Sequence, residues 1–196
     1  MPSPVAHSLI GLSLGAAWLT PARMAIKEMP KIIWGLRRPL VLCIVAANAP
    51  DLDFLPGLLT GDLNAFHQGL THTVPFVLAV AVVLRYVSRT WPKRRVAQWL
   101  FLIGASHLAA DLLTVDTREP IGIMGLWPFS REYFTAPFSI FMPLQKQSWA
   151  DLMRPYNWRV VSVELAWCLP LLLAVFAWKI KNSASLLTRR LPNNTE

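Results

Sequence analysis

The sequence predicts an all-α membrane protein, a polytopic helical bundle of about five spans. Three observations lead to this fold class. Of the 196 residues, 54% are hydrophobic and only 15% are charged. The mean hydropathy is +0.41, which is too apolar for an ordinary soluble domain. The apolar residues also form runs that are separated by short basic blocks. At this length the chain is predicted to be a single domain, residues 1–196.

The apolar runs, taken in order, are the expected membrane helices: 5–19, 39–59, 72–87, 96–115 and 160–178. The first run is short for a span of about 20 residues and would cross the bilayer only when tilted. Asp51 and Asp53 interrupt the second run. Either this span ends early or two carboxylates lie at membrane depth, where ionisable groups are costly and usually functional. Thr71 is the expected N-cap of the third helix, with Pro75 in its first turn.

The basic residues give the expected orientation of these helices. Three blocks hold 14 of the 19 Lys and Arg residues: Arg23 to Arg38, Arg85 to Arg95 and Lys179 to Arg190. Lys and Arg collect on the cytoplasmic side of membrane proteins, so five spans follow with the N-terminus outside. The pI is near 10.1. Because most basic residues sit in blocks beside apolar runs, they indicate a lipid bilayer as the partner and no nucleic acid.

Two segments lie outside the predicted spans. Segment 116–158 is rich in Pro, Phe and Trp and is predicted to be a long non-cytoplasmic segment, and 182–196 is predicted to be a polar C-terminal tail. No Lys or Arg precedes Arg23, so a cleaved signal peptide, which needs a positive n-region, is not expected. Cys43 and Cys168 both lie inside apolar runs, so no disulfide framework is indicated.

The predicted orientation delivers every histidine, together with three aspartates, to one side of the membrane. The stretch Ala49–His72 contains no Lys or Arg, so its carboxylates have no basic neighbour in sequence. Because the topology was derived from Lys and Arg alone, the convergence is an independent indication of a shared cation site. The predicted metal ligands are His7, Asp51, Asp53, His67, His72, His107 and Asp111.

Each part of this set also has a simpler interpretation. His107 and Asp111 are four residues apart and share a helix face, which also suits a structural hydrogen-bonded pair. Asp51 and Asp53 could be solvated carboxylates at a helix end, and His67 and His72 polar loop histidines. All of these interpretations would have to hold at once, which favours the metal site.

Imidazole and carboxylate ligands together suit zinc, manganese or iron better than calcium or magnesium. Seven candidates exceed the needs of one tetrahedral ion and leave room for two. Two ions that share an activated water are suited to the hydrolysis of a phosphate ester. A phosphate-binding P-loop, a dinucleotide fingerprint and a His-Glu-x-x-His helix are all absent from the sequence.

Four motifs resemble the YdjM-type inner-membrane proteins, which are described as membrane-bound metal-dependent hydrolases. They are Ala6-His7-Ser8, Pro50-Asp51-Leu52-Asp53, His67-x-Gly-x-Thr-His72 and Ser106-His107-Leu-x-x-Asp111-x-Leu-Thr114. The resemblance extends from residue 6 to the Leu126-Trp127-Pro128 motif. It implies a multi-span inner-membrane protein with ligands at the same seven positions and a more distant similarity to zinc-dependent phospholipase C. The family usually has Arg where this chain has Gln68, so Arg118, Arg131 and Lys146 are predicted to contact the substrate instead.

The predicted function is therefore that of a metal-dependent hydrolase of the cell inner membrane. It would cleave a phosphate ester of a lipid or lipid-linked substrate at a site that faces the non-cytoplasmic side. Zinc is the expected metal, as one or two ions, with manganese and iron as alternatives, and Asp53 and His72 are predicted to be catalytic. Two other functions stay open: a metal-binding transporter, and a catalytically silent membrane scaffold with a structural metal. Against a transporter, the last span has Glu164 as its only internal acid, and no second ligand set lies on the cytoplasmic side.

Overall fold

The computed structural model describes residues 1–62, 65–88, 95–115, 121–146 and 148–189. Within these residues the regular elements are all helical, and other backbone pairing is limited to two isolated bridges, Thr114 with Phe141 and Ile123 with Phe134. The all-α prediction is therefore confirmed. The elements are α1 (Pro4–Leu19), η1 (Ile26–Glu28), α2 (Met29–Gly35), α3 (Arg37–Asn48), η2 (Ala49–Asp53), α4 (Phe54–Thr60), η3 (Leu70–His72), α5 (Val74–Val87), α6 (Val96–Leu112), α7 (Trp149–Leu152) and α8 (Pro155–Arg189).

Each predicted span corresponds to a helical segment. Two of these segments are long and apolar enough to cross a bilayer: Arg37–Gly57, with 21 residues, and Pro155–Lys181, with 27 residues. The first of them joins α3, η2 and the start of α4, so the chain stays helical through Asp51 and Asp53. Helices α1, α5 and α6 are apolar but shorter. The count of five spans therefore stays a prediction for these three helices.

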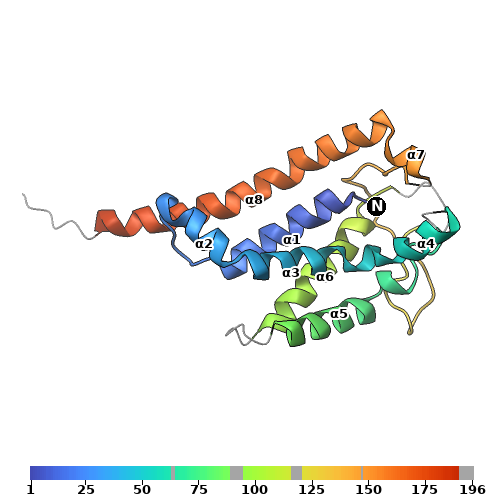
Figure 1. Cartoon of the computed structure of the whole chain (residues 1–196), viewed down its shortest axis with the longest axis horizontal. Coiled ribbons are helices and arrows are strands. Elements are labelled where there is room, and N and C mark those ends of the chain that lie inside the picture. Colours follow the sequence, from blue (N-terminus) through green and yellow to red (C-terminus); the bar gives the residue numbers. More distant parts are fainter. Residues whose placement is uncertain (63–64, 89–94, 116–120, 147, 190–196) are drawn as a thin grey trace, which may run out of the picture.

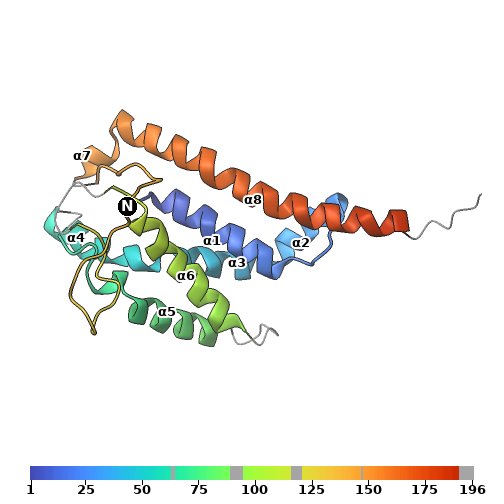
Figure 2. The same cartoon turned by 180° about the vertical axis from the view of Figure 1, so that it is seen from behind.

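Helices α1, α3, α5 and α8 run roughly along the length of the molecule, and α6 crosses the bundle at a steeper angle (Figures 1 and 2). Helix α1 is central because it packs against α3, α6 and α8, while α5 packs against α6. The largest buried apolar cluster lies between α3, α5 and α6 and consists of Cys43, Ala46, Ala47, Ala81, Leu84, Val96, Leu100 and Ile103. Several of these residues are small, which allows the helices to approach one another closely.

Two glycines on α1 allow it to approach α3 closely. A Cβ atom on Gly11 would lie 2.6 Å from the Cβ of Ala47 and 3.1 Å from the carbonyl oxygen of Cys43. One on Gly15 would lie 2.8 Å from the sulfur of Cys43. Only the absence of side chains at both positions allows α1 to sit this deep against α3.

Gly11→Ala is therefore expected to destabilise the protein by about 1–3 kcal/mol, the usual cost of overpacking. Gly35→Ala is the matched control because a Cβ there meets nothing within 4 Å, and alanine favours a helix by up to about 1 kcal/mol over glycine. Thermal or denaturant unfolding of the detergent-solubilised protein measures both changes. Equal stability of Gly11→Ala and the wild type would contradict the close packing of α1 on α3.

The predicted N-cap of the third apolar helix is corrected by two residues. The cap of α5 is Thr73, not Thr71: its hydroxyl oxygen accepts a hydrogen bond from the amide of Phe76 at 3.3 Å. Pro75 lies in the first turn, as predicted. The chain turns through η3 before α5 begins, and this turn leaves Thr71 outside the helix, where its hydroxyl has another partner.

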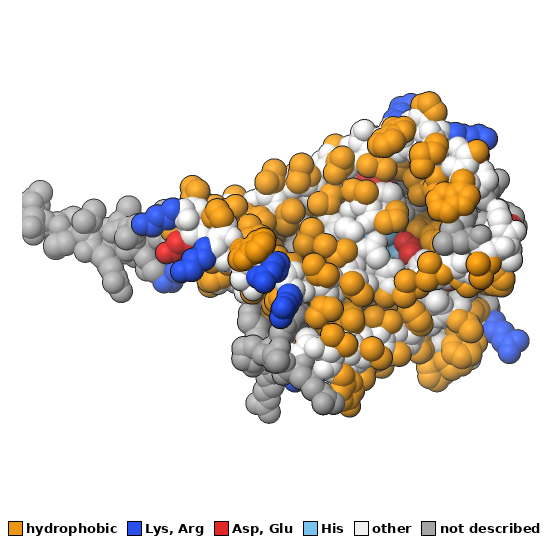
Figure 3. All heavy atoms as spheres, in the orientation of Figure 1, with side chains coloured by type: hydrophobic (Ala, Val, Ile, Leu, Met, Phe, Trp, Pro, Cys, Tyr) orange, Lys and Arg blue, Asp and Glu red, His pale blue; other side chains and the backbone are white. Residues whose placement is uncertain are grey.

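The described residues of the three basic blocks lie at one end of the bundle. This end carries α2 and the last turns of α8, and Lys and Arg side chains are visible there (Figures 1 and 3). At the opposite end, part of the segment 121–146 crosses the ends of α5 and α6. Its Gly125 carbonyl accepts from the amide of Val74 at 2.9 Å, and its Ala136 amide donates to the carbonyl of Leu112 at 3.0 Å. Helix α8 extends through residues 182–189 of the predicted polar tail.

Candidate metal centre

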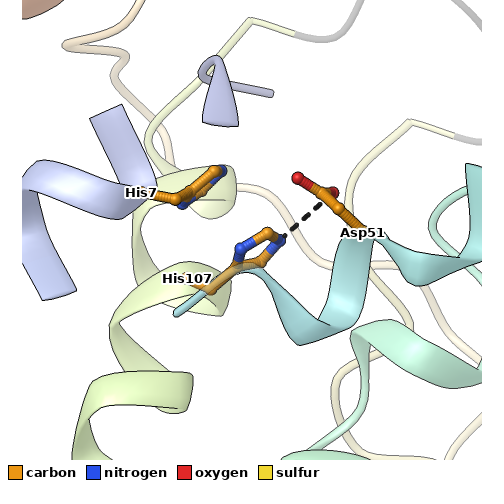
Figure 4. A group of neighbouring side chains, drawn as sticks. All are labelled: His7, Asp51 and His107. Carbon is orange, nitrogen blue, oxygen red and sulfur yellow. Dashed lines mark ion pairs between the residues drawn. The ribbon is translucent and has the colours of Figure 1, made fainter. Parts of the chain in front are cut away.

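All seven predicted ligands come together at the end of the bundle opposite the basic blocks. Their side chains are buried, with between 0% and 8% of the side-chain surface exposed. The elements that deliver them are α1 for His7, η2 for Asp51 and Asp53, the loop before η3 for His67, η3 for His72, and α6 for His107 and Asp111. Figure 4 shows His7, Asp51 and His107 turned toward a common point from three different elements.

Four donor atoms form the centre of this cluster. The Nε2 atoms of His72 and His107 are 3.3 Å apart. Both face Oδ2 of Asp111, at 3.4 and 3.1 Å respectively. Both also face Oδ1 of Asp51, at 3.6 and 3.5 Å. Zinc holds nitrogen and oxygen ligands at about 2.0–2.2 Å in a tetrahedron, so its ligands are about 3.3–3.6 Å apart. Four of the five separations fall in this range, and the 3.1 Å between His107 and Asp111 is slightly shorter.

Hydrogen bonds fix the tautomers of the two central imidazoles. Nδ1 of His107 lies 2.7 Å from the carbonyl oxygen of Ala47, which can only accept, so this nitrogen carries the proton. Nδ1 of His72 lies 3.1 Å from Oδ2 of Asp53 and donates to that carboxylate. A neutral imidazole protonated at Nδ1 presents a lone pair at Nε2. Both lone pairs therefore point into the centre, as metal ligands require.

Asp53 differs from the other carboxylates because its oxygens already have partners. Oδ1 faces Nδ1 of His67 at 2.9 Å. Oδ2 accepts from the Thr71 hydroxyl at 2.6 Å and from the backbone amide of Gln68 at 3.2 Å, in addition to its contact with His72. Asp53 belongs to none of the three groups of donor atoms that could hold an ion. These contacts favour a role in orienting His67 and His72 over the predicted direct coordination.

Asp53→Asn is therefore expected to lower the affinity for zinc by about 10–100-fold, as is usual for residues that orient a ligand, while the number of bound ions stays the same. Competition with a chromogenic chelator measures the affinity, and elemental analysis measures the number of ions. Asp151→Asn, in the capping box of α7, is the matched control. Loss of an ion from Asp53→Asn would show that Asp53 is itself a ligand.

A second group of donor atoms that could hold an ion includes His7. The Nε2 atom of His7 is 3.5 Å from Oδ1 of Asp111, the oxygen that does not face His72. The ring of His7 stacks on that of His107 with 3.7 Å between centroids (Figure 4). His7, Asp51 and His107 form one of the three groups with donor atoms within 4.8 Å of one another. Asp51 and Asp111 each have two oxygens and can therefore bridge two ions.

The cluster contains many polar atoms that lack a partner. Seven of its buried nitrogen and oxygen atoms have no hydrogen-bond partner within the described part of the chain: both ring nitrogens of His7, both carboxylate oxygens of Asp51 and of Asp111, and Nε2 of His67. A buried polar atom without a partner costs about 1–3 kcal/mol, and four of the seven atoms lie 3.1–3.6 Å from another ionisable group of the cluster. A divalent cation satisfies nitrogen and carboxylate donors of this kind, so the residues fit the metal predicted from the sequence.

His67 lies at the edge of the cluster, outside the apolar helices. Burial lowers the pKa of His67 to about 4, and the nearby Lys146 ammonium acts in the same direction. The ring is thus neutral at pH 7, and because Nδ1 donates its hydrogen to Asp53, Nε2 carries a lone pair that can bind a cation. Phe54 stacks on the ring at 4.3 Å between centroids. His67, Asp51 and His72 form the third group of donor atoms.

The three predicted substrate-binding residues differ in their position relative to the cluster. The Lys146 ammonium lies 4.9 Å from the centroid of the Phe54 ring, directly beside His67. Arg131 is exposed and makes no hydrogen bond or ion pair with the seven side chains in the part of the chain that the structure describes. Arg118 lies outside the described residues. Gln68 is buried and has a left-handed backbone, with φ of 66°, which places its amide against Asp53.

Three groups that support the site were not predicted from the sequence: the Thr71 hydroxyl, the Gln68 amide and the Ala47 carbonyl. Two are backbone groups, which carry no residue-specific signal. Thr71 does carry a signal in the sequence, because it directly precedes His72 in a polar stretch next to two carboxylates. Its hydroxyl was attributed to helix capping, the commoner role of threonine before an apolar run.

Comparison with known proteins gives two matches. The sequence profile of the family described as YdjM inner membrane protein matches residues 1–184. Over 186 residues the chain is 29% identical to the inner membrane protein YbcI of Escherichia coli (strain K12), and the match covers 91% of this chain and 99% of that protein. No solved structure gives a significant match.

Proposed function

Because the chain belongs to the YdjM inner membrane protein family, we propose that it is a membrane-bound, metal-dependent hydrolase that cleaves a phosphate ester of a lipid or lipid-linked substrate. Its location in the inner membrane follows from the family. The proposal adds five spans, a site on the non-cytoplasmic side and zinc as the metal, as one or two ions.

One observation carries the proposal: Nε2 of His72 and His107, Oδ2 of Asp111 and Oδ1 of Asp51 have the spacing of tetrahedral zinc ligands. When bound, a divalent cation lowers the pKa of water and stabilises negative charge on phosphoryl oxygens. His72 would hold the cation, and Asp53 would orient His72. Both residues would then be required for hydrolysis, with Asp53 acting through its contact with His72.

Access to the site supports a substrate that comes from the bilayer. Figure 3 shows a hollow between α8 and the α3–α4 region, with carboxylate and imidazole atoms at its floor and hydrophobic side chains around it. Leu52, Leu55 and Leu59 are 53%, 56% and 90% exposed on η2 and α4. Trp149 of α7 is 61% exposed. Apolar side chains beside a polar hollow suit a lipid whose head group reaches the cation while its chains stay in the membrane.

Lys146 is the residue best placed to bind the phosphate. Lys146→Met is expected to raise KM for an anionic lipid substrate about tenfold, the effect of losing roughly 1.4 kcal/mol of binding, with a smaller change in kcat. Arg131→Met is the matched control because Arg131 is exposed and should leave both constants unchanged. Equal effects of the two substitutions would contradict the role of Lys146.

The proposed activity is tested with the purified full-length protein in lipid nanodiscs, loaded with zinc and given a panel of phospholipids and lipid-linked phosphates. Release of phosphate or head group that depends on zinc, and that Asp111→Asn abolishes, is the expected result. Bound zinc without turnover on any substrate would favour the structural-metal scaffold. Zinc flux across proteoliposomes without turnover would favour the transporter.

A further inference from the structure

The last helix carries two buried ionisable side chains that contribute nothing to the metal centre. Glu164 is 1% exposed and Lys179 is 4% exposed, although much of α8 presents apolar side chains outward, such as Trp167, which is 62% exposed. Ionisable groups inside an apolar span are costly and are retained for a reason. Both groups form hydrogen bonds with residues at the ends of α1.

Glu164 holds the start of α1. Its Oε1 accepts from the backbone amide of Ser3 at 2.7 Å, and its Oε2 accepts a short hydrogen bond from the Ser3 hydroxyl. Ser3 is the N-cap of α1, and its hydroxyl oxygen accepts from the amide of Ala6. The amide of His7 donates to the carbonyl of Ser3 at 3.2 Å. The residue that Glu164 holds is therefore one helical turn from a predicted metal ligand.

Lys179 holds the other end of α1. Its Nζ donates to the carbonyl oxygens of Ala17 at 2.7 Å and Thr20 at 3.2 Å, two of the carbonyls that a helix end leaves without a partner. The length of α1 agrees with the distance between Glu164 and Lys179 along α8. At about 1.5 Å per residue, the 16 residues of α1 are about 24 Å long, and Glu164 and Lys179 stand about 22 Å apart along α8.

The signs of the two charges also match α1. A helix carries partial positive charge at its N-terminus and partial negative charge at its C-terminus. The carboxylate of Glu164 lies at the first end and the ammonium of Lys179 at the second. Reversing α1, or sliding it by one turn along α8, would break both sets of contacts. Helix α8 packs mainly against α1, so α1 is the element whose position it sets.

We propose that Glu164 is a positioning residue for His7: together with Lys179 it fixes α1 along α8, and so sets the depth at which His7 enters the metal centre. His7 is the only one of the seven ligands on α1. The other six come from the loop and helices between Ala49 and Leu112. Glu164 should therefore affect the ion that depends on His7 and leave the ion held by His72 and His107 in place. The inference rests on the two-ion form of the proposed centre, so a wild-type protein that binds a single ion would overturn it.

The test is a zinc titration of the full-length protein in nanodiscs, with competing chelators that resolve two affinities. The wild type is expected to bind two ions, and His7→Ala is expected to weaken only the second. Glu164→Leu should weaken the second ion at least about tenfold and leave the first within about twofold. Glu164→Gln, which keeps an oxygen acceptor for Ser3, should have a smaller effect in the same direction. Leu173→Ala, at a position that is 58% exposed on α8, is the control.

A double-mutant cycle separates positioning from a general effect on the fold. In the His7→Ala background, Glu164→Leu should have no further effect on zinc binding, because residues that act through one another are not additive. Any of three results would overturn the proposal. They are unchanged zinc affinities in both Glu164 variants, an equal loss of both ions from folded protein, and effects of Glu164→Leu and His7→Ala that add. If Glu164→Leu does not fold, Glu164→Gln is judged by the same criteria. A wild-type protein that binds no zinc would instead contradict the proposed function.

Discussion

Asp111→Asn is expected to abolish zinc-dependent hydrolysis and to weaken zinc binding by roughly 100- to 4000-fold. The Asp111 carboxylate faces His7 with one oxygen and both His72 and His107 with the other, so it serves both ion positions. An asparagine has the same shape but one oxygen and no charge. Breaking a buried charged contact of this kind costs about 3–5 kcal/mol, which corresponds to the stated change in affinity.

The same substitution distinguishes a metal centre from a network of structural ion pairs. If the cluster holds metal, metal-free Asp111→Asn should be at least as stable as the metal-free wild type, because the substitution removes one of the carboxylates that crowd the centre. Thermal unfolding in the presence of a strong chelator measures this. Asp151→Asn is the control for both readouts. A metal-free Asp111→Asn that unfolds well below the metal-free wild type would indicate that Asp111 is a structural ion-pair partner.

Removal of the metal is expected to lower Tm by about 5–10 °C. A ligand at 100 times its Kd stabilises the folded state by about 2.7 kcal/mol, and each kcal/mol shifts Tm by about 2–4 °C in a chain of this size. The buried carboxylates and imidazole nitrogens without partners provide the physical reason. Tm is measured before and after dialysis against chelator, then after each metal is added back.

Zinc, and more weakly manganese, should restore Tm, because the centre mixes nitrogen and oxygen donors. Magnesium and calcium should not, since both prefer oxygen ligands alone. The restoration by different metals is the internal control of this experiment. Full recovery with magnesium, or no change on dialysis, would contradict the assignment of the donor set.

The residues of the centre could be predicted from the sequence because two independent signals agreed. The Lys and Arg blocks fixed the relative direction of the helices, and helical spacing put His107 and Asp111 on one face. Both depend on residue type and position alone. In the structure, donor atoms of His7, Asp51 and His107 lie within 4.8 Å of one another.

The division of roles within the centre could not be predicted, because it depends on side-chain conformations and backbone partners. Asp51 and Asp53 are two residues apart in the same motif, yet Asp51 leaves both oxygens without hydrogen-bond partners while Asp53 uses both for His67, Thr71 and neighbouring groups. The difference arises from the 3-10 turn η2, which directs the two carboxylates differently. No pattern of residue types encodes that turn.

The contact between α8 and α1 could not be predicted from the sequence either. Glu164 was visible as an isolated acid in the last span, but its partner Ser3 is separated from it by almost the whole chain. Likewise, the sequence does not distinguish Lys146 from Arg131, since both are basic residues of one segment. Only the fold places Lys146 beside Phe54 and His67. Long-range neighbours of this kind follow from packing, which a single sequence does not specify.

The most direct measurement is X-ray absorption at the zinc edge, combined with the metal content of the purified protein. We expect up to two zinc ions per chain and a first shell of nitrogen and oxygen ligands alone at about 2.0–2.2 Å, with the imidazole scattering typical of histidine. Two results would contradict a centre built from these histidines and aspartates. One is a protein that holds no zinc even after zinc is added, and the other is a ligand shell that contains sulfur at about 2.3 Å, from Cys43 or Cys168.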